Sequence, residues 1–146
     1  MRYFMYNLTN GTIKEIFEYK NSKYRWVYRQ LISVLEDDDI EPSGTVAVTD
    51  GYAFIVTMAD AYSIDVVLSH EIGHAITGHD QDGEWKHGNE FQADAHAVDV
   101  VGKERVLKVL HDLQQHLRWR NKYIRYADYS RMIDKIGERI KRIEAA

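Results

Sequence analysis

The sequence predicts an α+β fold that is mostly helical, with a small antiparallel sheet packed against one central helix. Two short runs rich in β-branched and aromatic residues flank Asp50-Gly51, which is the strongest hairpin signal in the chain. From residue 63 onward, apolar residues recur mostly at helical spacing. The chain has 146 residues, 45% of them hydrophobic, and a single proline, so we expect one domain spanning residues 1–146.

The first third of the chain predicts one strand and two helices before the hairpin. Residues 1–8 alternate weakly between apolar and polar side chains, which favours a strand. Residues 12–17 begin with a capping-box pattern and predict a short helix. Residues 22–36 carry an apolar stripe at helical spacing and predict a helix packed on the core. The hairpin strands are then expected at 45–49 and 52–57.

The central helix is expected from Ser63 to Thr77. Ser63 is a suitable N-cap residue, and Gly78 stands where a glycine commonly ends a helix. The C-terminal half of this helix carries the motif H-E-x-x-H at residues 70–74. The helix is therefore the element in which we look for chemistry.

On a helix, His70 and His74 project from one face, about one turn apart. Two imidazoles at this spacing can bind one Zn²⁺, with Zn–N bonds of roughly 2.0–2.1 Å. Glu71 is placed to reach a water on that metal and to act as the general base. Gly73 costs the helix about 1 kcal/mol relative to alanine. We expect this cost where another backbone or a substrate must pass close to the helix.

A second helical stretch supplies a candidate third ligand. It begins at Asn89 and ends near Gly102, and Glu90 and Asp94 share one of its faces beside the small Ala93. Glu90 can complete the three protein ligands that a catalytic zinc needs, while Asp94 accepts a hydrogen bond from a zinc-bound histidine. The alternative is a helix N-terminus that is acidic only because carboxylates suit the helix dipole.

The two motifs together, H-E-x-x-H followed by N-E-x-x-A-D, resemble those of the gluzincin metallopeptidases. In that family the glutamate is the third metal ligand, and the aspartate orients the first histidine. The longer run at residues 70–79 is similar to the small intracellular metallopeptidases of the ImmA/IrrE type. The resemblance covers about Thr45 to Val101 and implies a minimal zincin-like domain that binds one Zn²⁺.

Other ligand sets stay open on the sequence. Asp80 occupies the final position of a metzincin-type pattern, although Thr77 stands at the glycine position of that pattern. His79 and His87 are also close enough in sequence to bind a metal, but we favour Glu90 as the third ligand. We instead consider His87 the first candidate for stabilising the oxyanion of the reaction, with Tyr62 and the C-terminal tyrosines as alternatives.

The function predicted from these residues is zinc-dependent hydrolysis of peptide bonds in a narrow set of protein or peptide substrates. Glu71 would take a proton from the water and pass it to the leaving amine. By the resemblance, an edge strand pairs with extended substrate, and our candidate is residues 52–58. The alternative is a metal-stabilised regulatory or binding protein without turnover. Such a scaffold has no need for Glu71, so we favour the enzyme.

Composition predicts a cytoplasmic protein with no membrane attachment. The chain lacks cysteine, and no apolar run approaches the roughly 20 residues that a bilayer span requires. Its N-terminal residues also lack the apolar stretch and cleavage site of a signal peptide.

Charge is divided unevenly along the chain. Residues 1–102 carry a net charge of −10, whereas the helical part from about residue 103 carries +6. This basic part mixes cations with aromatic residues, a composition that also occurs in nucleic-acid-binding proteins. Because Trp119, Tyr123 and Tyr126 recur at helical spacing, we favour an amphipathic helix packed on the body over a nucleic-acid partner.

Overall fold

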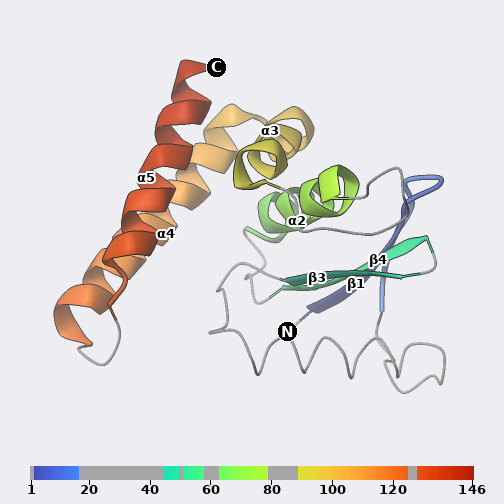
Figure 1. Cartoon of the computed structure of the whole chain (residues 1–146), viewed down its shortest axis with the longest axis horizontal. Helices are drawn as coiled ribbons and strands as arrows, with labels where there is room; N and C mark the ends of the chain where they lie inside the picture. The colour runs from blue at the N-terminus through green and yellow to red at the C-terminus, as the bar shows by residue number, and fades with distance from the viewer. Residues whose placement is uncertain (1, 17–44, 50, 58–62, 79–88, 125–127) are drawn as a thin grey trace.

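The computed structural model describes residues 2–16, 45–49, 51–57, 63–78, 89–124 and 128–146 (Figure 1). The strands are β1 (Arg2–Asn7), β2 (Ile13–Glu15), β3 (Thr45–Thr49) and β4 (Tyr52–Thr57). The helices are α2 (Ile64–Gly78), α3 (Glu90–Val101), α4 (Lys103–Tyr123) and α5 (Ser130–Ala145). This architecture confirms the mostly helical α+β class. The helix predicted at residues 22–36 lies outside the described residues.

The four strands form one antiparallel sheet in the order β2-β1-β4-β3. The predicted hairpin is confirmed, because β3 and β4 pair with Thr49 opposite Tyr52. Gly51 in the connecting turn has a φ of 77°, which is accessible to glycine without steric cost. The turn residue therefore sets the register of the hairpin.

The short helix predicted at residues 12–17 is wrong, because Ile13–Glu15 is strand β2 and pairs with β1. A tight turn explains the difference. The side chain of Asn7 accepts hydrogen bonds from the backbone N–H groups of Thr9 and Asn10, and Gly11 has a φ of 73°. These local bonds reverse the chain and direct the next residues back along β1, so the turn prevails over the capping-box pattern.

The proposed edge strand is also placed differently. β4 pairs with β1 on one side and with β3 on the other, so it is internal to the sheet. Among the described strands, β2 and β3 are the outer ones. A backbone with both sides paired has no free N–H and C=O groups for a substrate, and β4 is thus ruled out for strand addition.

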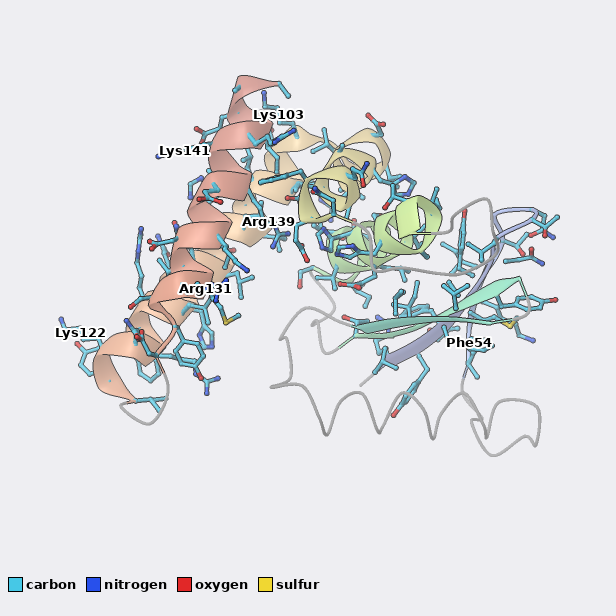
Figure 2. All side chains as sticks on the ribbon, in the orientation of Figure 1. Phe54, Lys103, Lys122, Arg131, Arg139 and Lys141 are labelled. Atoms are coloured by element: carbon cyan, nitrogen blue, oxygen red, sulfur yellow. The ribbon has the colours of Figure 1, made fainter. Side chains whose placement is uncertain are left out.

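Helix α2 lies across one face of the sheet (Figure 1). The core between them is apolar and contains Phe4, Val46, Ala53, Ile55, Ile72 and Ala75. On the opposite face of the sheet, Phe54 and Val56 are buried as well, and Figure 2 shows Phe54 pointing away from α2. Both faces of β4 are therefore buried, as expected for a central strand.

A second core is formed by the helices. Helix α3 packs beside α2, and α4 and α5 form an antiparallel pair that extends away from the sheet (Figure 1). The buried members of this core are Val66, Ala97, Val106, Leu110, Leu117, Ile136, Ile140 and Ile143. Gly102, with a φ of 95°, ends α3 and lets α4 start in a new direction.

The face of α4 that packs on the protein is aliphatic, whereas the sequence predicted an aromatic one. Trp119 and Tyr123 are 53% and 61% exposed, and their rings contact each other with centroids 5.4 Å apart. The apolar residues buried on this helix are Val106, Leu110 and Leu117, and the polar Gln114 is buried beside them. Helical spacing identified an amphipathic helix, but the two aromatic rings lie on its solvent side. Tyr126 lies outside the described residues.

Candidate metal centre

Helix α2 brings the three residues of the H-E-x-x-H motif together in a buried position. His70, Glu71 and His74 are all buried, and Glu71 is only 2% exposed. The two imidazole rings meet edge to face at right angles, with centroids 4.6 Å apart. The rings are thus neighbours one helical turn apart, as the four-residue spacing predicted.

Helix α3 begins at Glu90 and places its carboxylate against both histidines. The side chain of Asn89 caps the helix by accepting a hydrogen bond of 2.7 Å from the N–H of Phe91. Glu90 Oε2 lies 3.0 Å from His70 Nε2, and Glu90 Oε1 lies 3.2 Å from His74 Nε2. A cap at Asn89 therefore fixes the start of the helix at the residue that faces the histidines.

These three side chains fit a metal ion in chemistry and in spacing. One candidate ligand atom from each lies within 4.8 Å of the others. Ligand atoms on a tetrahedral zinc with bonds of 2.0–2.1 Å are separated by roughly 3.3 Å. The observed distances of 3.0 and 3.2 Å between imidazole nitrogens and carboxylate oxygens are close to that separation. His70, His74 and Glu90 could accordingly hold one metal ion.

The contact between α2 and α3 depends on glycine. A Cβ built on Gly73 would lie 2.8 Å from the Cα of Ala93 and 3.0 Å from the Cβ of His96. No side chain fits at these distances, so the two backbones can approach only because residue 73 is glycine. The sequence predicted such a close approach, and α3 is the backbone that makes it.

Asp94 orients His70 from the side opposite the candidate metal position. His70 Nδ1 donates a hydrogen bond of 2.9 Å to Asp94 Oδ1, and Asp94 is fully buried. When the ring is neutral and keeps its proton on Nδ1, it presents the lone pair of Nε2 toward His74 and Glu90. This is the tautomer that a metal ligand requires.

One side chain that contacts the site has no signal in the sequence. Arg139 on α5 donates two hydrogen bonds to Asp94, from Nε to Oδ2 at 2.9 Å and from Nη2 to Oδ1 at 2.8 Å. Its Nη1 also lies 3.5 Å from Glu90 Oε2. Arg139 is 45 residues beyond Asp94 in the chain and belongs to no motif, so only tertiary structure reveals it.

The electrostatics of the site reflect this dense pairing. Burial lowers the pKa of His70, but the hydrogen bonds to Asp94 and Glu90 outweigh burial and raise the pKa to about 9. Burial raises the pKa of Glu90, yet hydrogen bonds from both histidines hold it well below its usual range. Burial also raises the pKa of Asp94, but the hydrogen bonds from Arg139 and His70 outweigh burial and lower that pKa. Both carboxylates are therefore ionised at neutral pH.

The structure does not describe the other ligand candidates, which include His79. Asp80, His87 and Tyr62 are outside the described residues, so the rival ligand and the oxyanion donor stay predictions. Within the described part of the chain, His70, His74 and Glu90 form the one group of three metal-binding side chains in mutual reach.

The fold and the site define a small α+β protein with a His-His-Glu cluster formed between two packed helices. No family model matches the chain, and neither the curated proteins nor the solved structures contain a match. None of the helices in the described ranges combines the length and apolar composition needed to cross a membrane.

Proposed function

We propose that this chain is a zinc-dependent metallopeptidase of gluzincin type, close in style to the small ImmA/IrrE-like proteins, that hydrolyses peptide bonds in a narrow set of protein substrates. The observation that carries the proposal is the meeting of Glu90 with both histidines of the H-E-x-x-H helix at 3.0 and 3.2 Å. Two imidazoles and a carboxylate suit zinc and leave a fourth position open for water.

Each residue of the site has its own proposed role in hydrolysis. His70, His74 and Glu90 would hold the ion, and Asp94 keeps the His70 ring in the tautomer that directs Nε2 inward. Zinc, when bound, acidifies a water and polarises the peptide carbonyl. Glu71 is the proton carrier: its carboxylate takes the proton of the attacking water and transfers it to the leaving amine.

The burial of Glu71 supports this role. Burying a carboxylate as deeply as Glu71, which is 2% exposed, costs free energy that its partners must offset. A metal-stabilised scaffold needs the three ligands but gains nothing from a buried acid next to the first histidine. Because β4 is internal, the strand we propose for pairing with extended substrate is β3, which contacts α2 and is an outer strand among those described.

The test combines metal analysis with one conservative substitution. Protein purified without chelators should contain about one zinc per chain, and Glu90→Ala should lose it. Glu71→Gln should retain zinc but lose turnover by at least about a hundredfold, because the amide cannot accept the proton. Wild type and Glu71→Gln are incubated with cell lysate, and new peptide termini are compared by mass spectrometry.

Each outcome separates the enzyme from the scaffold. Termini formed only by wild type support a peptidase with a narrow substrate range. Equal termini with Glu71→Gln would remove Glu71 from the mechanism. If neither protein produces termini while both retain zinc and capture the same partner, the chain is a metal-stabilised regulatory or binding protein.

A further inference from the structure

Helix α5 contributes a cation to a site whose candidate ligands all come from α2 and α3. Arg139 projects from α5 toward these two helices, whereas Lys141 points to the other side of α5 (Figure 2). Its guanidinium contacts Asp94 at 2.8 and 2.9 Å and approaches Glu90 at 3.5 Å. The basic C-terminal part of the chain is thus connected directly to the metal centre.

The two-point contact fixes the plane of the Asp94 carboxylate. A planar guanidinium that donates to both oxygens permits little rotation of the carboxylate. Asp94 Oδ1 accepts from Arg139 Nη2 and from His70 Nδ1 at the same time. Arg139 consequently sets the direction of the hydrogen bond from His70 to Asp94. Because this bond orients the ring, it also determines where His70 Nε2 points.

The surroundings make the charge of Arg139 important for this arrangement. His70, Asp94 and Arg139 line a small cavity together with apolar residues of α2, α3 and α4. In an apolar environment a buried carboxylate with only one hydrogen bond is unfavourable, and two neighbouring carboxylates repel each other. Arg139 compensates the charge of both Asp94 and Glu90. Removing it leaves only the His70 ring to balance the two carboxylates before any metal binds.

We propose that Arg139 is a positioning residue that couples the docking of α5 to metal binding. It binds no metal and acts through Asp94 on His70, because its hydrogen bonds to Asp94, at 2.8 and 2.9 Å, are shorter than its 3.5 Å contact with Glu90. The inference rests on the metal centre of the proposed function. Because coupling is reciprocal, zinc binding should in turn hold α5 more firmly against α3.

The experiment measures zinc affinity by competition with a chromogenic chelator, in wild type and in three variants. Arg139→Met should weaken zinc binding by about 10–100-fold, the usual effect of disturbing the hydrogen-bond partner of a metal-binding histidine, which is Asp94 here. Arg139→Lys keeps the charge but loses the two-point contact, so its zinc affinity should lie between those of wild type and Arg139→Met. Arg131→Met removes the same charge from an exposed position on the same helix and should bind zinc like wild type (Figure 2).

A double-mutant cycle distinguishes positioning from a general effect on folding. If Arg139 acts through Asp94, the Asp94→Asn, Arg139→Met double variant should bind zinc nearly as well as Asp94→Asn alone. If the role of Arg139 were purely structural, the losses of zinc affinity in the two single variants would be independent and would multiply in the double variant. Melting curves in EDTA verify folding, and Arg139→Lys replaces Arg139→Met in the cycle if the latter does not fold.

A second readout requires no activity. Zinc should slow amide hydrogen exchange at residues 136–143 of α5 in wild type, and this protection should be lost in the Arg139 variants. Unchanged zinc affinity in Arg139→Met, multiplying losses in the cycle, or protection that persists without Arg139 would each overturn the inference. If wild type binds zinc but cleaves nothing, only the peptidase proposal fails. If wild type binds no zinc, both are rejected.

Discussion

Replacing Gly73 by alanine tests whether the approach of α2 and α3 creates the metal centre. The added Cβ would lie 2.8 Å from the Cα of Ala93, whereas ordinary contacts at such positions are 3.4–4 Å. Because the obstacle is backbone, α3 must move away by roughly 1 Å to relieve the clash. Glu90 is on that helix and would move with it, while the histidines stay on α2.

The expected effect on zinc binding is larger than the effect on stability. Overpacking costs about 1–3 kcal/mol, and the higher helix propensity of alanine returns about 1 kcal/mol, so the metal-free protein should lose about 0–2 kcal/mol. Metal–ligand distances tolerate only about 0.2 Å, so a shift of Glu90 by roughly 1 Å should weaken zinc binding at least about tenfold.

The matched control is Gly137→Ala on α5. There the new Cβ would lie 3.3 Å from Gln114 Nε2, which donates to the carbonyl of Ile133, so a side-chain shift of a few tenths of an ångström is enough. This variant should be up to about 1 kcal/mol more stable than wild type and should bind zinc equally well. Chelator competition and urea unfolding in EDTA measure both quantities. If Gly73→Ala bound zinc within twofold of wild type, the close helix approach would not be what positions Glu90.

Two further predictions concern pH and core packing. In EDTA the free energy of unfolding should fall as pH rises from 6.5 to about 9, by up to about 3 kcal/mol. The raised pKa of His70 adds stability only while the ring is protonated. This contribution is fully present below the unfolded pKa of 6.5 and is lost as the pH rises to about 9. Zinc affinity should change in the opposite direction and rise with pH, because the metal competes with that proton. Urea melts and zinc titrations at pH 6, 7.5 and 9 measure both, and a flat stability profile would contradict the pairing. In the helical core, Leu110→Ala should cost about 2–5 kcal/mol, whereas Val100→Ala at an exposed position should change stability by less than about 0.5 kcal/mol; equal losses would contradict the assigned core.

The candidate ligands could be predicted because helical spacing translates directly into geometry. Two histidines four residues apart on a helix must be neighbours, so His70 and His74 needed no tertiary information. Glu90 and Asp94 were recognised as one face of a second helix, and Gly73 and Ala93 indicated where that helix would pack. The bounds of α2 and α3 therefore differ from the prediction by only a residue or so.

Pairing between distant segments could not be obtained in this way. Residues 12–15 carry a capping-box pattern, and only the turn at Asn10-Gly11 together with the neighbouring strand makes them β2. Whether β4 is internal or at an edge depends on β1, which precedes it by about fifty residues. Arg139 is similar: one more arginine in a basic helix has no local signal that distinguishes it from its neighbours.

The position of α2 explains why the two histidines of the candidate metal centre are buried, whereas the side chain of Glu90 on α3 is 39% exposed. On one side Ile72 and Ala75 belong to the core shared with the sheet, and on another Val66 belongs to the core of the helices. The histidines lie at the seam between these two cores, where α3 is held by the fit of Gly73 and Ala93 and by the contacts of Arg139. A metal at this seam would join α2 to α3 and, through Asp94, to α5. Its binding energy would then add to the stability of both cores, since ligands from two helices can be bridged only while the helices are packed together.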